Sequence, residues 1–138
     1  MPIPIESPKP RVTEQTWGQE ILLAEAPGYT LKLLRYKAGR AGGLQMHTTK
    51  DEAFYLHEGE AWVDYASGPA DMLIARRAVA GDCFRVPPGA VHRFTAETDC
   101  TVFEASTNVE NDRVRMERWY GQPEVGGLPS TAPEPVRP

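Results

Sequence analysis

Short runs with an apolar period close to two occupy the middle of this chain. Residues 30–36, 61–65 and 91–96 show it most clearly, and a period of two predicts β-strands rather than helices. Further short strands are predicted over residues 44–47, 52–56, 72–80, 84–86 and 101–106. A helical turn is expected only over residues 110–119.

Glycine and proline separate these runs. The chain contains 12 glycines and 13 prolines, and they stand between apolar segments as turn residues do. Residues 57–60 are predicted to join strands 52–56 and 61–65 as a β-hairpin, with Gly59 free to adopt a positive φ. Pro87-Pro88-Gly89 is expected to reverse the chain. Many short strands in 138 residues predict an all-β barrel or sandwich.

Composition narrows the partners and the compartment. A net charge of −4 argues against nucleic acid as a partner, since proteins that bind a phosphate backbone are usually basic. No segment is long and apolar enough to span a membrane, and no secretory signal precedes the first strand. Two cysteines, Cys83 and Cys100, are too few for a disulfide scaffold. They are expected to be free thiols, although the sequence alone does not exclude a disulfide bond between them. These features predict a cytoplasmic protein.

Pro-rich segments flank one domain of ordinary size. Residues 1–14 are predicted to form an extended N-terminal arm, residues 15–121 the domain, and residues 122–138 a Pro/Gly-rich C-terminal tail. In isolation such a tail is disordered or polyproline-like. Alternatively, it docks on its own domain or on a neighbouring subunit.

Two polar clusters carry the candidate chemistry. Gln45 and His47 stand two residues apart in a predicted strand and therefore share a face. If Glu52 begins the next strand of a hairpin, its carboxylate returns to that face, and His92 follows the Pro-Pro-Gly turn. Such a mixed nitrogen and oxygen set suits one divalent transition metal, which could be Zn, Mn, Fe, Ni or Co. We therefore expect Gln45, His47, Glu52 and His92 to be metal ligands.

The spacing of these residues resembles the two cupin motifs. The matching patterns are Gly39-x5-Gln45-x-His47-x4-Glu52-x6-Gly59 and Gly81-x5-Pro87-x-Gly89-x2-His92. Gln45 stands where the first histidine of the family is usual, and Ala96 replaces its final asparagine. The resemblance covers residues 30–107. It implies a single cupin barrel, also called a double-stranded β-helix or jelly roll, with extended arms at both ends.

A narrower resemblance is to the phosphomannose isomerase-like cupins. Their Gln-x-His pair matches Leu44-Gln45-Met46-His47, their opening Trp-Gly pair matches Trp17-Gly18, and residues 110–121 look similar to their closing segment. Thr48 and Thr49 replace two histidines of the bifunctional enzymes, and Lys50 replaces an arginine. This resemblance implies a sugar or sugar-phosphate substrate.

Side chains near the predicted site are candidates for the cavity wall. We expect an apolar interior made of Phe54, Leu56, Val63, Phe94 and Val102. Basic residues placed near the cavity mouth can bind a phosphate or carboxylate, and these are Lys50, Arg85, Arg93 and Arg115. The predicted substrate-binding residues are Lys50, Phe54, Arg85, Phe94 and Arg115. His57 is expected in solvent and Cys83 in a buried strand position.

Three functions are compatible with this site. The first is a sugar or sugar-phosphate isomerase that works through a metal-stabilised enediol, with no catalytic base identified by the sequence. The second is an iron-dependent dioxygenase of a small molecule. The third is a cupin that binds a small ligand without catalysis. A homodimer is expected in each case, since a small barrel leaves sheet edges that need cover.

Overall fold

Eleven β-strands make up the part of the fold that the structure describes. The structure, a computed structural model, describes residues 5, 6, 8–124 and 126–137, and no helix occurs among them. The strands are β1 (Arg11–Gln15), β2 (Gly18–Ala26), β3 (Tyr29–Tyr36), β4 (Gln45–His47), β5 (Glu52–Glu58), β6 (Glu60–Ala66), β7 (Ile74–Val79), β8 (Cys83–Val86), β9 (Val91–Ala96), β10 (Cys100–Ser106) and β11 (Arg113–Arg115). Within the described ranges no helix could cross a bilayer.

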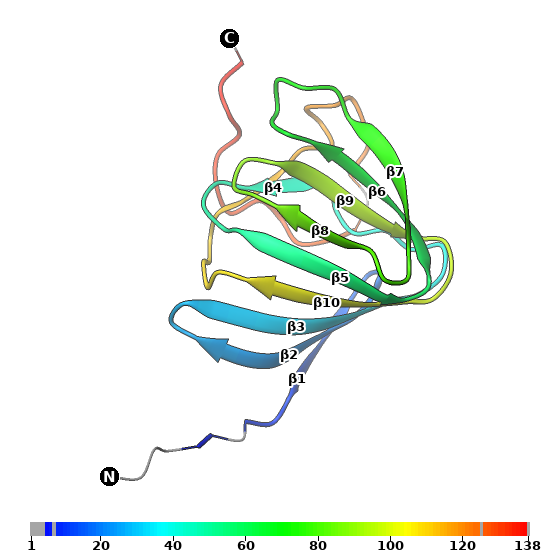
Figure 1. Cartoon of the computed structure of the whole chain (residues 1–138). Coiled ribbons are helices and arrows are strands. Elements are labelled where there is room, and N and C mark those ends of the chain that lie inside the picture. The colour runs from blue at the N-terminus through cyan, green and yellow to red at the C-terminus, as the bar shows by residue number, and fades with distance from the viewer. Residues whose placement is uncertain (1–4, 7, 125, 138) are drawn as a thin grey trace.

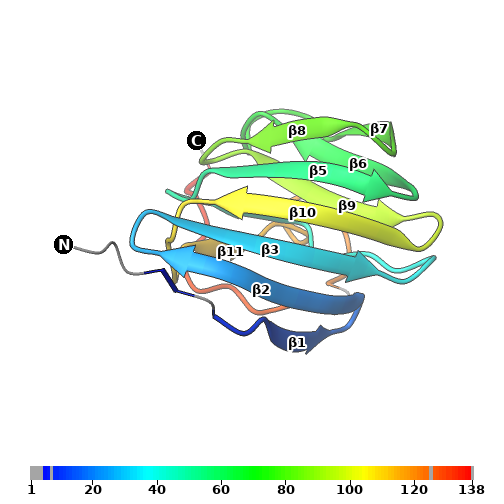
Figure 2. The ribbon, with the colours of Figure 1, turned by 60° about the horizontal axis from the view of Figure 1, so that its bottom comes forward.

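The strands form two antiparallel sheets that face each other across a common interior (Figure 1). One sheet has the order β1-β2-β3-β10-β5-β8, which Figure 2 shows from its broad side, and the other has the order β11-β4-β9-β6-β7. Successive strands often belong to opposite sheets. This arrangement confirms the predicted all-β jelly-roll barrel.

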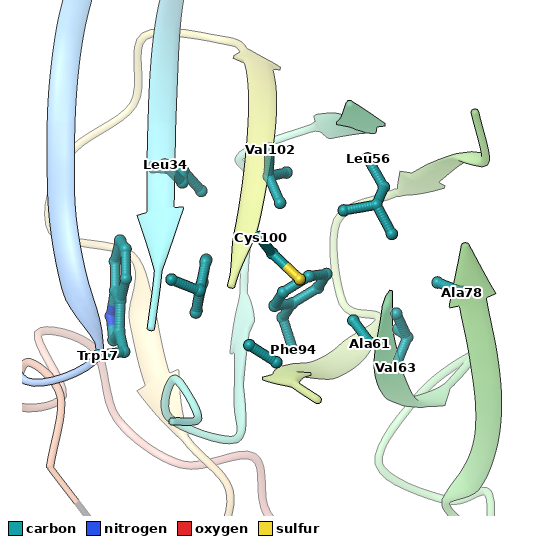
Figure 3. Packing of buried hydrophobic residues seen from close by; sticks show 11 residues of the cluster. Trp17, Leu34, Leu56, Ala61, Val63, Ala78, Phe94, Cys100 and Val102 are labelled. Atoms are coloured by element: carbon teal, nitrogen blue, oxygen red, sulfur yellow. The ribbon is translucent and has the colours of Figure 1, made fainter. Parts of the chain in front are cut away.

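The interior is filled from both sheets by every second residue of the central strands. Figure 3 shows Leu34, Leu56 and Val102 of the six-stranded sheet meeting Val63 and Phe94 of the five-stranded sheet. Leu56 is 0% exposed and Val102 is 1% exposed, as the alternation predicts for inward positions. All five residues expected in the apolar interior lie in or against this cluster.

The prediction for Cys83 is wrong, because this side chain is exposed. In β8 it is the neighbours Phe84 and Val86 that occupy inward positions, so Cys83 lies on the outer face of the sheet. Cys100 is buried, and both thiols are free. His57 lies in solvent as expected.

Neither predicted hairpin forms. Gly59 has a φ of +100°, but it turns the chain between β5 and β6, which belong to opposite sheets. A Cβ atom at this position would stand 2.3 Å from the carbonyl oxygen of Asp99, so the corner requires glycine. Likewise β4 and β5 lie in opposite sheets. The sequence period identified β4, β5 and β6 as strands, whereas their partners depend on long-range packing.

The predicted helical turn over residues 110–119 is also wrong. Residues Arg113–Arg115 form β11, which pairs antiparallel with β4. Val114 is fully buried and packs with Leu44 and Met46, so tertiary packing holds this segment extended. Only the residues after it turn, with the Tyr120 amide donating to the carbonyl of Met116.

Two strands at the start of the domain escaped the sequence analysis. β1 overlaps the predicted N-terminal arm and pairs along its length with β2. The pairing of β2 with β3 shifts between Leu22 and Ala24, because a bulge interrupts the strand. A bulge moves the following side chains to the opposite face, which hides the period of two from the sequence.

The C-terminal segment docks on its own domain. The amide of Arg113 donates to Thr131 Oγ1, and the amide of Thr131 donates to the Arg113 carbonyl. The amide of Arg115 donates to Ser130 Oγ, while its guanidinium binds the carbonyl of Gly126. Residues 126–132 therefore run beside β11 and lengthen the barrel wall.

Candidate metal centre

Glu52 stands between two imidazole rings in the barrel interior. Its Oε1 lies 3.5 Å from Nε2 of His47, and its Oε2 lies 3.4 Å from Nε2 of His92. The exposed fractions of Glu52, His47 and His92 are 4%, 4% and 7%. The structure thus brings together three of the four predicted ligands within a few ångströms.

Both sheets contribute to this cluster. His47 ends β4 and His92 is the second residue of β9, in the five-stranded sheet, whereas Glu52 begins β5 in the six-stranded sheet. The carboxylate therefore reaches the histidines across the interior, and not along a hairpin as the sequence suggested. Gln45, the fourth predicted ligand, is the register partner of His92 in the neighbouring strand.

Asp112 fixes the orientation of His47. Its Oδ1 lies 2.8 Å from Nδ1 of His47, and its Oδ2 accepts hydrogen bonds from the backbone amides of Thr49 and Lys50. With Nδ1 donating to the carboxylate, Nε2 is the unprotonated nitrogen and points to Glu52. A carboxylate behind a histidine is a common support for metal-binding rings.

Burial sets the charge of the cluster. It lowers the pKa of His47 and that of His92 to about 4, although Asp112 raises the first in part. Burial raises the pKa of Glu52 to about 7. Burial also acts to raise the pKa of Asp112, but the Thr49 and Lys50 amides and His47 outweigh it and hold that pKa at about 2. Both imidazoles are therefore neutral at pH 7, with lone pairs available to a cation.

The cluster fits a divalent cation in its donor chemistry. Among the described residues, Oε2 of buried Glu52 has no hydrogen-bond partner, and such a carboxylate is costly without a cation. Separations of 3.4 and 3.5 Å between donors match the spacing of two ligands about 2.0–2.2 Å from one ion. In the described ranges no group of three or more His, Cys, Asp or Glu side chains is already arranged to hold a metal ion. The ring centroids are 6.3 Å apart, so the side chains must close in slightly on an ion.

A cavity of about 110 Å³ adjoins the cluster. Two of the predicted substrate-binding residues, Phe54 and Phe94, form part of its wall, together with Gln45, Glu52 and His92. Gly127 and Leu128 of the docked C-terminal segment complete the wall. The C-terminal segment is therefore part of the site.

Three of the four basic residues expected near the cavity mouth lie elsewhere. Arg85 donates two hydrogen bonds to Asp51 and borders a second cavity of about 340 Å³, which also reaches His92. Arg115 is buried and donates to both carboxylate oxygens of Glu117. Lys50 borders a different surface cavity. None of these three lines the smaller cavity. Arg93, the fourth basic residue expected near the cavity mouth, does line it, together with Arg113, which the sequence analysis did not single out.

Two acidic residues of the site were missed by the sequence analysis. Asp112 lies in the segment misread as helical, and Glu104 lies in a strand where a lone glutamate resembles an ordinary outward residue. The signal for Glu104 was the alternation of β10, in which Cys100, Val102 and Ser106 all face inward.

The chain belongs to the cupin domain family, whose model matches residues 32–105. This match confirms the broader of the two resemblances. No curated protein matches the sequence significantly.

Solved structures share the fold at low identity. CapF, a capsular polysaccharide assembling protein from Staphylococcus aureus, superposes with a TM-score of 0.69 at 16% identity over 78% of this chain and 34% of CapF. KdgF from Halomonas sp. gives 0.63 at 20% identity over 72% of this chain and 89% of KdgF. An RmlC-like cupin from Shewanella frigidimarina gives 0.64 at 18% identity, over 74% and 86% of the two chains. The match thus spans about a third of CapF, and these likenesses show the fold alone.

Proposed function

We propose that this cupin binds one divalent transition metal and isomerises a sugar or sugar phosphate. The observation that carries the metal proposal is the position of Glu52, with one carboxylate oxygen near each imidazole Nε2. Its metal ligands would be His47, Glu52 and His92, with the amide oxygen of Gln45 as a neutral fourth. Zn, Mn, Fe, Ni and Co all accept such a set.

The cavity beside the cluster supports a hydroxylated substrate. A bound divalent ion supplies a Lewis acid that stabilises negative charge on a substrate oxygen. Phe54 and Phe94 give the wall flat apolar surfaces, and Gly127 and Leu128 of the docked C-terminal segment also line it. The carboxylates of the wall can accept hydrogen bonds from hydroxyl groups, as sugar recognition requires.

Arg113 supports the phosphate form of the substrate. It lines the cavity and, among described residues, forms no direct ion pair. Its guanidinium donates to the carbonyl of Pro129 at 3.4 Å, and its charge also acts on Glu52. Arg93 lines the same wall but is held by Asp64 and Gln122. Arg113 is therefore the cation best placed to bind a phosphate. The likeness to CapF, which assembles capsular polysaccharide, lies in the fold and adds nothing to this choice.

A second candidate function is that of an iron-dependent dioxygenase. Two histidines and one carboxylate, without Gln45, form the set that non-haem Fe(II) oxygenases use. The cluster of His47, Glu52 and His92 has this composition. This candidate predicts iron in the native protein and oxygen uptake with a substrate.

The test is the conversion of sugars by metal-loaded protein. We expect NMR spectra to show interconversion of D-mannose 6-phosphate and D-fructose 6-phosphate, or of the neutral sugars, and no interconversion by His92→Ala. Oxygen uptake without interconversion would favour the dioxygenase instead. Binding without either reaction, retained after the metal is removed, would show a non-catalytic ligand-binding cupin.

We also propose that the protein is a homodimer that pairs through the outer face of the six-stranded sheet. Phe103 lies opposite Leu33 on one side and Tyr55 on the other, so a row of apolar side chains crosses three strands. All three alternate with inward residues, which places them on the outer face. An apolar row of this kind on a sheet face is typical of a homodimer contact.

A further inference from the structure

Glu104 is a buried carboxylate that the metal centre does not use. It lies on β10, is 7% exposed, and lines the cavity beside Glu52 and His92. Its neighbours on the inward face of β10 are Val102 and Ser106. A glutamate in this position has to be explained, since a buried carboxylate without partners costs several kcal/mol.

The side chains around Glu104 leave one of its oxygens free. Across the sheet its register partners are Lys32 in β3 and Phe54 in β5. Lys32 points its ammonium group to Glu20, with Nζ 3.0 Å from Oε1, and Phe54 offers no donor. Within the described chain, Oε2 of Glu104 accepts no hydrogen bond. The cavity therefore contains a buried acceptor that the fold does not satisfy.

We propose that Glu104 is a substrate-binding residue whose free Oε2 accepts a hydrogen bond from a hydroxyl group of a sugar-type ligand. The inference rests on the proposed function, because it places the ligand in the cavity next to the metal centre. A hydroxyl donor replaces the water that Glu104 loses on burial. Specificity follows, since a site built around a buried polar group rejects analogues that lack its partner.

The electrostatics of the cavity agree with this role. Burial, and then the charge of Glu52, raise the pKa of Glu104 to about 7. Lys32 and Lys50 oppose this shift only in part. A neutral hydroxyl is accordingly a better occupant at this end of the cavity than a phosphate, which Arg113 can bind instead.

The test compares Glu104→Gln with wild type in the metal-loaded full chain. The probes are D-fructose, D-mannose and their 6-phosphates, with binding measured by calorimetry. We expect binding to weaken at least tenfold in E104Q, with metal content unchanged. Glu60→Gln is the matched control: Glu60 is an exposed glutamate that pairs with Arg77 and does not line this cavity, and we expect less than a threefold change.

The two proposals fail in different ways. Equal binding by wild type and E104Q would overturn the role of Glu104, even if the protein interconverts the sugars. Weaker binding by E104Q without any interconversion would support Glu104 and contradict the isomerase. No binding of any probe by metal-loaded wild type would contradict both. The melting temperature of each variant checks that it is folded, and Glu104→Leu, which removes the acceptor and leaves a similar volume, should lose binding as well.

Discussion

Asp112 lies 2.8 Å from Nδ1 of His47, although 65 residues separate them in the sequence. The contact joins β4 to the loop before β11, next to the docked C-terminal segment. Asp112 also caps the Thr49 and Lys50 amides, so its position is fixed independently of the histidine. Asp112, near the C-terminal end of the domain, therefore orients the imidazole ring of His47 in the candidate metal centre.

Asp112→Asn should weaken metal binding without unfolding the protein. The asparagine can still accept from the backbone amides, but it loses the charge that supports His47. Loss of such a carboxylate typically costs 10–100-fold in metal affinity. Zinc titration against a competing chelator measures the effect. Asp51→Asn is the control, since the Asp51 side chain pairs with exposed Arg85 and not with a histidine. A similar loss in both variants would contradict the role of Asp112.

Glu104→Gln should stabilise the metal-free protein at alkaline pH. The folded pKa of about 7 lies above the ordinary value of 4.5, so the folded state binds the extra proton between these values. Stability from this group is therefore present below pH 4.5 and is lost as pH rises through 7. The unfolding free energy of E104Q minus that of wild type should be larger at pH 8 than at pH 5. His47 and His92 are present in both proteins. Glu52 interacts with Glu104, so removal of the Glu104 charge also favours the ionised form of Glu52, which acts in the same direction. A difference independent of pH would contradict the shift.

Glu117→Gln should destabilise the domain much more than a similar change on the surface. Glu117 is 2% exposed and pairs with Arg115, which also binds the carbonyl of Gly126. Removal of one partner of a buried pair costs about 3–5 kcal/mol. The exposed pair of Asp51 and Arg85 is screened by solvent and contributes little to stability, so Asp51→Asn is the control in urea unfolding. Equal losses would show that the buried pair does not anchor the C-terminal segment.

Phe103→Glu should convert the proposed dimer into a monomer. A charge in the centre of an apolar contact is strongly unfavourable, and Phe103 lies in the middle of the row. Light scattering should give twice the chain mass for wild type and the chain mass for F103E. Trp62→Glu is the control, because Trp62 is 41% exposed on the opposite sheet. A wild-type monomer at micromolar concentration would refute the dimer.

The sequence predicted the site better than the connections between strands. The spacing of the motifs predicted that His47, Glu52 and His92 lie close together, because this spacing reflects where each strand starts and ends in the barrel. It could not show that β4 and β5 lie in opposite sheets, since the period of two is the same for either pairing. Arg85 and Arg115 were expected at the cavity mouth because they stand near the candidate site in the sequence. Their actual partners, Asp51 and Glu117, depend on the tertiary fold. Glu104 was missed although it stands two residues after Val102, which was expected in the interior, so the alternation of β10 was the available signal.

The central claim is that His47, Glu52 and His92 hold one metal ion. Wild-type protein and His92→Ala should be purified in parallel without chelators and analysed for Zn, Mn, Fe, Ni and Co. We predict close to one ion per chain in wild type and less than a tenth of that in the variant. An equal metal content in both proteins, or none in wild type after equilibration with these metals, would contradict the claim.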